Sequence, residues 1–198
     1  MGAQDLAAAR KAYADARPFP HAVFEDAMTS DDRELADSWP DADWPGWQRF
    51  GDEYQRNKAY CEHIDDIPVP LREVLHELAS PDFLRWLEGL TGISKLLPDP
   101  YLNGGGLHMS TSGGVLTPHT DFHLNLQLDL YRRVNVLLYF NEEWQQEWGG
   151  CLEFYDSPTA KSPTRTVVPR WGTMVVFTTD DRSVHGFPQP ITDGHVRR

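Results

Sequence analysis

Hydrophobic residues recur at helical spacing in the first half of the chain. Residues 69–79 contain an apolar stripe. Counted from its first leucine, positions 0, 3, 4 and 7 are Leu71, Val74, Leu75 and Leu78. This spacing places four side chains on one face of an α-helix, so a helix is predicted here. His76 lies off the stripe and is expected on the solvated side.

A second helix is predicted directly after the first. Ser80 can cap its N-terminus, Pro81 suits its first position, and Gly92 is typical of a helix end. Its apolar stripe consists of Phe83, Leu84, Leu87 and Leu90.

Upstream of these helices the pattern is less regular. Residues 3–16 predict a polar, Ala-rich helix, and residues 19–24 a short buried strand. Another helix is predicted through Ala36, with Thr29 or Ser30 as its cap. Residues 40–58 are rich in Trp, Pro, Gly and charged residues, which indicates an exposed loop or hairpin.

After Gly92 the spacing becomes that of strands. Short runs rich in β-branched and aromatic residues occupy 104–110, 134–140, 151–156, 165–169 and 173–179. Turn or loop signals separate them at 111–114, 147–150, 157–164 and 169–172. Helices followed by many short strands favour an antiparallel sandwich or barrel over a parallel sheet. The predicted fold is therefore mainly β, with supporting α-helices packed on one outer face.

Length and charge narrow the classes of function. The 198 residues suit a single domain, with 1–92 as a mostly helical N-terminal support and 93–198 as the strand-rich core. The net charge of −12 disfavours nucleic acids and anionic membranes as partners. We find neither a run of about 18 apolar residues nor a signal peptide, so a cytoplasmic protein is expected. Cys61 and Cys151 match no zinc or redox spacing and are interpreted as reduced structural residues.

Candidate chemistry is concentrated in residues 117–123, TPHTDFH. In an extended segment His119 and Asp121 point the same way, about 6.6 Å apart at Cα, close enough to hold one metal ion. His185, on a distant segment, would complete a set of two histidines and one carboxylate. Such a triad leaves three positions of an octahedral ferrous ion open. A His-x-Asp pair alone also arises by chance, so the sequence around it must decide whether the pair binds a metal ion.

Those surroundings resemble a known family. The segments GGGLHMSTSGGVLTPHTDF, RRVNVLLYFNEEWQQEWGGCLEFYD and VVFTTDDRSVHGFPQP are similar to iron(II)- and 2-oxoglutarate-dependent oxygenases of the prolyl-4-hydroxylase-like group. The resemblance covers about residues 85–198, and PFPHAVFEDAM shows a weaker one. It implies a double-stranded β-helix, a cupin-like jelly roll, with its metal site in residues 93–198.

The resemblance also implies roles for individual residues. The iron ligands are expected to be His119, Asp121 and His185, and Arg197 is expected to bind the far carboxylate of 2-oxoglutarate, with Arg198 as the competing choice. An arginine suits this task because its planar fork meets a carboxylate through two hydrogen bonds.

Further site residues are less certain. Tyr139 matches a tyrosine that hydrogen-bonds the cosubstrate, and Leu152 an apolar residue of its pocket, although core packing would explain both. The family continues beyond this arginine with a serine and another strand, whereas the sequence stops at Arg198. We therefore expect an arginine near a frayed end, poorly oriented for binding.

The implied activity is hydroxylation of an unactivated C–H bond by dioxygen, with 2-oxoglutarate converted to succinate and carbon dioxide. Ascorbate is a candidate reductant. Halogenating relatives replace the carboxylate ligand with a small residue, so Asp121 favours hydroxylation or another oxidation such as desaturation. The expected substrate is a small molecule or a peptide: an amino acid, a prolyl peptide or a natural-product intermediate. The oligomeric state stays open.

Two other classes share parts of this pattern. A metal-binding cupin-type isomerase or binding protein would need additional histidines, and only His123 could serve. A nucleic-acid demethylase would share the triad but is disfavoured by the negative charge. Other residues near the triad have open roles, either in the site or as solvated polar groups: His108, Asp180, Asp181 and Arg182.

Overall fold

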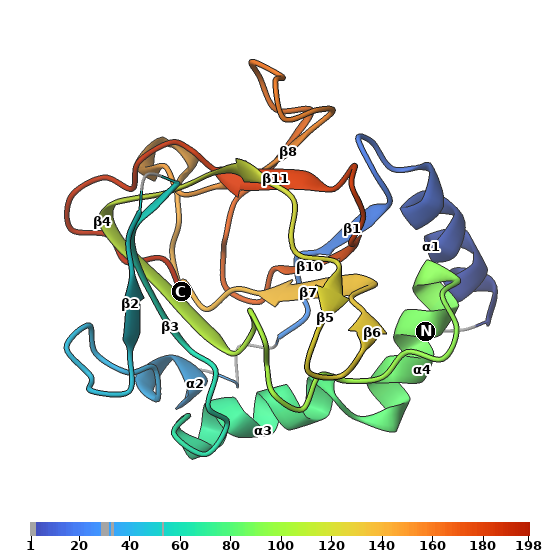
Figure 1. Cartoon of the computed structure of the whole chain (residues 1–198), viewed down its shortest axis with the longest axis horizontal. Coiled ribbons are helices and arrows are strands. Elements are labelled where there is room, and N and C mark those ends of the chain that lie inside the picture. The colour runs from blue at the N-terminus through green and yellow to red at the C-terminus, as the bar shows by residue number, and fades with distance from the viewer. Residues whose placement is uncertain (1–2, 29–31, 33, 53) are drawn as a thin grey trace.

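Two antiparallel sheets form the centre of the protein (Figure 1). The computed structural model describes residues 3–28, 32, 34–52 and 54–198. The larger sheet has the strand order β2-β3-β4-β11-β8-β9, and the smaller sheet has the order β1-β10-β7. A short hairpin, β5–β6, stands apart from both. The strands are β1 (His21–Phe24), β2 (Gln48–Phe50), β3 (Gln55–Cys61), β4 (Leu107–His119), β5 (Leu124–Asn125), β6 (Leu130–Tyr131), β7 (Val134–Leu138), β8 (Leu152–Tyr155), β9 (Arg165–Val167), β10 (Met174–Thr178) and β11 (Val184–Phe187).

The two sheets are held together by a layer of buried side chains. Phe154 on β8 packs against Phe177 on β10, with ring centroids 5.6 Å apart, and Phe19 packs against both. Residues along β10 alternate between this layer, which takes Val175 and Phe177, and the opposite face of the sheet. Because both faces of β10 are covered, its run of apolar residues is nearly continuous.

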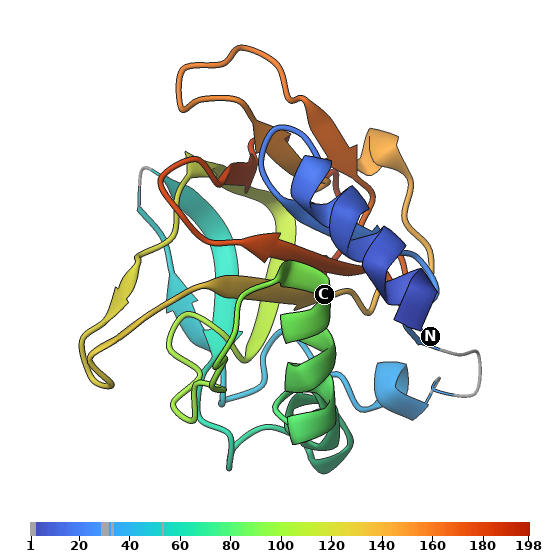
Figure 2. The same cartoon turned by 90° about the vertical axis from the view of Figure 1, so that its right-hand side faces the viewer.

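Helices cover the outer face of the smaller sheet. The helices are α1 (Ala3–Asp15), α2 (Glu34–Asp37), α3 (Val69–Leu78) and α4 (Pro81–Thr91), and η2 (Gln146–Trp148) is a short 3₁₀ turn. Helices α1 and α4 lie side by side over this sheet (Figure 2). Tyr13 of α1 and Leu90 of α4 pack with Met174 and Val176 of β10. Leu71 of α3 packs instead in a second cluster with residues of β3 and β4. The mainly-β fold with supporting helices on an outer face is confirmed.

The predicted ends of α4 are confirmed by their hydrogen bonds. The Ser80 hydroxyl accepts a hydrogen bond from the Phe83 amide at 3.2 Å, and Gly92 adopts the left-handed conformation at φ 74°. Such a conformation suits glycine because it has no Cβ. For the helix predicted through Ala36, which is α2, the expected caps Thr29 and Ser30 lie outside the described residues.

One prediction about loops is wrong, and another is right except at one residue. The TSGG stretch, predicted as a turn, lies within the continuous strand β4. Gly113 has a φ of 74°, and the register between β3 and β4 shifts between Arg56 and Lys58. The glycines therefore form an irregularity in the paired strands rather than a reversal of the chain. In residues 40–58 the expected hairpin exists as β2–β3, but Trp47 is buried in the core rather than exposed.

The first 92 residues contribute more than helical support. In the described part of that segment there are three strands: β1 pairs with β10 in the smaller sheet, and β2 and β3 extend the larger sheet beside β4. Within the described chain, no helix combines the length and apolarity that crossing a membrane requires.

Residues 197 and 198 are well anchored, which corrects the expectation of a frayed end. Arg197 and Ser110 of β4 exchange two backbone hydrogen bonds, at 2.8 and 2.9 Å. The Arg198 amide donates to the Asn141 side chain at 2.8 Å, and the Arg198 carbonyl accepts from Phe140 and Asn141. These bonds tie the segment to both β4 and the end of β7.

Candidate active site

Sheet register brings His119 and His185 together. His119 is the last residue of β4, and it is the direct cross-strand partner of His185 on β11. Residues opposite each other in antiparallel strands carry their side chains on the same face. The two imidazole rings accordingly lie with their centroids 4.6 Å apart.

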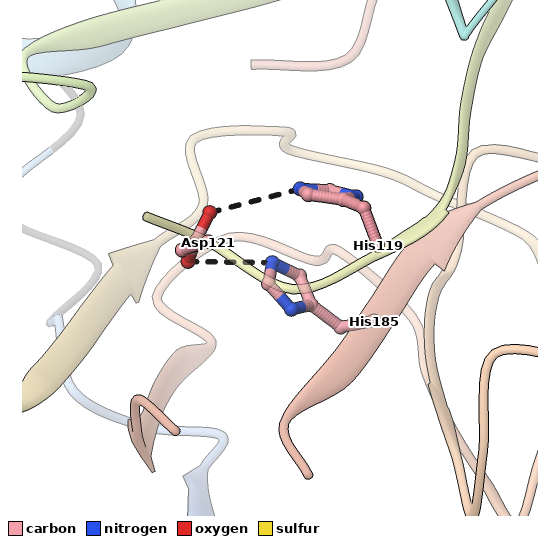
Figure 3. Close-up of side chains that lie close together, drawn as sticks. All are labelled: His119, Asp121 and His185. Carbon is pink, nitrogen blue, oxygen red and sulfur yellow. Dashed lines mark ion pairs between the residues drawn. The ribbon is translucent and has the colours of Figure 1, made fainter. Parts of the chain in front are cut away.

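Asp121 completes the cluster from the loop after β4. The sequence argument placed it on the same strand as His119, but β4 ends at His119 and Asp121 follows in non-regular structure. Its carboxylate oxygens lie 3.6 Å from Nε2 of His119 and 3.7 Å from Nε2 of His185 (Figure 3). The three ligand atoms lie within 4.8 Å of one another.

Both histidines direct the same ring nitrogen, Nε2, toward the Asp121 carboxylate. Nδ1 of His119 contacts the Thr117 carbonyl at 2.9 Å, and Nδ1 of His185 contacts the Ser183 carbonyl at 2.8 Å. A carbonyl only accepts, so each Nδ1 carries the proton and each Nε2 keeps its lone pair for a ligand. Burial lowers the pKa of His185 to about 4, which keeps this ring neutral at pH 7.

Polar neighbours hold the Asp121 carboxylate in place. Asn135 of β7 donates a side-chain hydrogen bond to Oδ2 of Asp121, and the Arg132 guanidinium donates to Oδ1 of Asn135 at 2.9 Å. Burial would raise the pKa of Asp121, but the contact with His119 and the positive charges around it hold this pKa well below its usual range. The carboxylate is thus ionised and fixed in orientation.

This donor set fits a divalent transition metal. Two ligand atoms that are each about 2.1 Å from one ion can be at most about 4.2 Å apart. Each histidine Nε2 lies within that limit of one Asp121 oxygen, at 3.6 Å from Oδ1 and 3.7 Å from Oδ2. Two imidazoles and one carboxylate, with no thiolate, are the facial triad of non-haem iron(II) sites. His119, Asp121 and His185 are the residues that could hold such an ion.

The triad opens into a cavity of about 600 Å³. Arg197, Tyr139 and Leu152, the other residues expected in the site, line the same cavity. Nη2 of Arg197 donates to the Tyr139 hydroxyl at 2.9 Å, and the guanidinium also lies 4.4 Å from the centre of the Phe187 ring. Nε of Arg197 is buried and has no hydrogen-bond partner among the described residues. A buried donor of this kind is suited to an anionic ligand.

Tyr139 and Leu152 belong to both the core and the cavity wall. They are 4% and 2% exposed and pack in the cluster between the sheets. Burial raises the pKa of the Tyr139 hydroxyl, although the Arg197 charge opposes this rise. The phenol is therefore neutral at pH 7 and can still donate its own proton while accepting from Arg197.

The remaining candidate residues lie outside the triad. Nδ1 of His123 is 3.3 Å from Asp181, and His123 is absent from the metal-ligand cluster of the described chain. His108 lines the cavity with Nε2 on the Gly105 carbonyl at 2.9 Å. Asp180 pairs with Arg182 in an exposed turn.

Three cavity residues were missed by the sequence argument. The sequence could have indicated a role for Asn135, because it is a lone polar residue within an apolar strand, where an unpaired amide would be costly. No such indication exists in the sequence for Arg132 and Lys58, because distant segments, the loop before β7 and the strand β3, bring them to the same cavity.

A double-stranded β-helix with a facial triad at its cavity defines a class: non-haem metal-dependent oxygenases. Residues 105–198 match the family model of the 2OG-Fe(II) oxygenase superfamily. This match confirms the resemblance found in the sequence motifs.

Individual relatives agree with this match. The chain is 25% identical to prolyl 3-hydroxylase OGFOD1 of Xenopus laevis, over an alignment of 191 positions that covers 92% of this chain. It spans only 34% of that relative and 25% of the mouse protein of the same name. The chain is therefore similar to about a third and about a quarter, respectively, of these longer proteins.

Solved structures support the fold. A Pseudomonas putida prolyl-4-hydroxylase superposes with a TM-score of 0.64 at 20% identity, over 97% of this chain and 94% of that one. A Trichoplax adhaerens prolyl hydroxylase, bound to a peptide fragment of hypoxia inducible factor, also gives 0.64, at 13% identity over 98% and 86%.

Proposed function

We propose that the protein is an iron(II)- and 2-oxoglutarate-dependent hydroxylase. The observation that carries this proposal is one cavity with the His119–Asp121–His185 cluster and the Arg197–Tyr139 pair in its lining. A 2-oxo dicarboxylate needs both a metal for its oxo-acid end and a cation for its far carboxylate. The match of residues 105–198 to the oxygenase superfamily supports this interpretation.

Each residue has a distinct role in the proposal. His119, Asp121 and His185 would hold the iron, which when bound supplies the activation of dioxygen that organic side chains cannot provide. Arg197 would bind the far carboxylate of 2-oxoglutarate, using the buried Nε that has no partner within the described protein. Tyr139 would keep the guanidinium in place and share the carboxylate, while Leu152 would exclude water beside it.

The proposed reaction is balanced. One oxygen atom of O2 enters a substrate C–H bond as a hydroxyl, and the other enters succinate as 2-oxoglutarate loses carbon dioxide. The four electrons that reduce O2 come in equal pairs from the substrate and from 2-oxoglutarate. Ascorbate would be needed only to return oxidised iron to the ferrous state. Asp121 as a carboxylate ligand supports hydroxylation rather than halogenation.

We infer a small molecule or a peptide as substrate. Amino acids, prolyl peptides and natural-product intermediates all remain in this class, and similarity to proteins named prolyl hydroxylases favours a prolyl residue. The net charge of −12 argues against nucleic acid. Cys61 and Cys151 are both free and buried, which fits a reducing compartment such as the cytoplasm.

The cupin-type alternative, a metal-binding isomerase or binding protein, is less well supported. Its additional histidine would have to be His123, whose Nδ1 faces Asp181 instead. Such a protein would also have no use for a buried arginine with an orphaned donor opposite its metal.

A succinate-release screen tests the proposal. The iron-loaded protein is supplied with 2-oxoglutarate and ascorbate, and succinate is measured across amino acids, prolyl peptides and pathway intermediates. We expect at least one compound to raise succinate well above the rate without substrate. If no 2-oxoglutarate is bound or consumed under any condition, the proposal fails and the cupin-type isomerase or binding protein is preferred.

A further inference from the structure

The charge of the cavity is opposite to that of the chain. The whole sequence has 18 basic and 30 acidic residues. The cavity is lined by six basic residues and only two acidic ones, Asp99 and Asp121. The basic residues are Lys58, Lys95, Arg132, Arg133, Arg197 and Arg198. A cleft lined by one sign of charge attracts ligands of the other sign.

Metal and cosubstrate do not account for this excess. An iron(II) ion and a 2-oxoglutarate dianion cancel each other in charge, so the cavity keeps its surplus of positive side chains when both are bound. Arg197 has a role in the proposed cosubstrate site, and Arg132 is engaged with Asn135. Lys58 has no role in the proposed chemistry, although it lies within the same cavity.

Sheet register places Lys58 in a row with Arg197. Lys58 on β3 is the cross-strand partner of Ser110 on β4, and Ser110 is bridged on its other side to Arg197. Direct cross-strand neighbours carry their side chains on one face of a sheet, and all three residues line the cavity. The Lys58 side chain therefore enters the site from the edge opposite the Arg197 segment.

Lys58 lacks an anionic partner within the described chain. None of the ion pairs found there within 4.0 Å, and none of the side-chain hydrogen bonds, includes its ammonium group. Burial lowers the pKa of Lys58 and the nearby charge of Arg197 lowers it further, while the carboxylates of Asp121 and Glu62, which form no ion pair with it, act in the opposite direction. A partly buried cation beside another cation is unfavourable unless an anion joins them.

We propose that Lys58 binds an acidic group of the substrate, a carboxylate or a phosphate, and so selects for anionic substrates. This inference rests on the proposed function, because it concerns the substrate that would share the cavity with iron and 2-oxoglutarate. The Ser110 hydroxyl, next to Lys58 in the row, offers a second hydrogen-bond donor to the same group. Lysine suits either oxyanion because its ammonium acts as a point charge with three donors.

The competing role for Lys58 is that of a second anchor for 2-oxoglutarate. Calorimetry distinguishes the two roles. The first measurement is the affinity of the manganese-loaded protein for 2-oxoglutarate alone. Four proteins are compared: the wild type, Lys58→Met, Lys58→Arg and Lys161→Met. Lys161 is an exposed lysine outside the cavity, so its variant removes the same charge elsewhere on the molecule.

We expect all four proteins to bind 2-oxoglutarate within about threefold of one another, because an unchanged contact leaves affinity unchanged. A loss in Lys58→Met as large as the loss caused by Arg197→Met would make Lys58 a cosubstrate anchor and overturn the inference. Failure of the wild type itself to bind 2-oxoglutarate would instead refute the proposed function, so the two failures are distinguishable.

Matched probes then test for the acidic group, with 2-oxoglutarate at saturation. N-acetyl-L-proline is compared with N-acetyl-L-prolinamide, and N-acetyl-O-phosphoserine amide with N-acetylserine amide. Each pair differs only in the acidic group, so the pair that shows a preference identifies a carboxylate or a phosphate. In the wild type and Lys161→Met we expect the acid of one pair to bind about tenfold or more tightly than its neutral partner.

The preference should vanish in Lys58→Met and persist in part in Lys58→Arg, which retains the charge. If neither acid binds better than its neutral partner in the wild type, or if Lys58→Met keeps the full preference, the inference is overturned.

Discussion

Nε2 of His119 and Nε2 of His185 are directed at the two oxygens of one carboxylate, from strands that are cross-strand partners. The backbone hydrogen bonds between β4 and β11 therefore set the spacing of the two rings before any metal binds. Each ring is fixed further by its Nδ1 contact with a carbonyl two residues earlier. Preorganisation of this kind spares a metal site the cost of ordering its ligands on binding.

Metal binding should stabilise the protein through this cluster. With Mn²⁺ at a hundredfold excess over its Kd, we expect Tm to rise by roughly 5–10 °C, because a ligand of the folded state stabilises it by mass action. His185→Ala should remove most of this rise in a thermal-shift measurement. His76→Ala is the control, since His76 is exposed on α3. An equal rise in wild type and His185→Ala would exclude His185 as a ligand.

Asn135 should act on the metal through Asp121. Replacement of Asn135 by Leu removes the hydrogen bond to the carboxylate, and metal affinity should fall about 10–100-fold, as is typical when a ligand loses its supporting partner. Titration with Mn²⁺ measures the affinity.

Asn125→Leu is the matched control for this prediction. Asn125 is also buried, but its side chain bonds Asp99 and the backbone of residues 127 and 128 rather than the triad. Both variants should be compared at a temperature where each is folded. Unchanged metal affinity in Asn135→Leu, or an equal loss in Asn125→Leu, would show that Asn135 does not support the metal site through Asp121.

Arg197 and Arg198 should differ in 2-oxoglutarate binding. Arg197→Met should weaken binding about 30-fold or more, because loss of one partner of a buried charge pair costs about 2 kcal/mol or more. Arg198→Met should stay within about threefold of the wild type, because the backbone of Arg198, not its side chain, makes the anchoring bonds to Asn141. Calorimetry on the metal-loaded protein gives both values, and the reverse order would move the role to Arg198.

Gly106 should be essential to the pairing of β3 with β4. It has a φ of 76°, and an added Cβ would lie 2.1 Å from the Cys61 carbonyl oxygen. Gly106→Ala should therefore lower the free energy of unfolding in urea by about 1–3 kcal/mol or more. Gly51→Ala, where a Cβ would meet nothing within 4 Å, is the control. Equal stability of the two variants would show that the backbone adjusts at no cost.

Local sequence signals predicted much of the scaffold. The stripe and caps of α4 depend only on residues within one helix, and the structure has both where they were expected. The apolar runs around Val136 and Val175 predicted β7 and β10, because β-branched and aromatic residues are favoured in strands. Strand β11 was not marked in advance, since four residues that include His185 and Gly186 carry little pattern.

Other features depended on contacts between distant segments. Gly113 and Gly114 have the composition of a turn, but pairing with β3 keeps them in a strand. The anchoring of Arg197 depends on Ser110, which is 87 positions earlier, so the sequence could indicate the arginine but not its fixed position. Likewise, Lys58 enters the cavity only because β3 lies beside β4.

The central claim is that His119, Asp121 and His185 hold an iron that drives 2-oxoglutarate turnover. Its most direct test is succinate production by the iron-loaded protein with 2-oxoglutarate and ascorbate, in the wild type, His119→Ala, His185→Ala and the control His76→Ala. We predict iron-dependent succinate in the wild type and in His76→Ala, and none above background in the other two. Undiminished turnover in His119→Ala or His185→Ala would contradict the account.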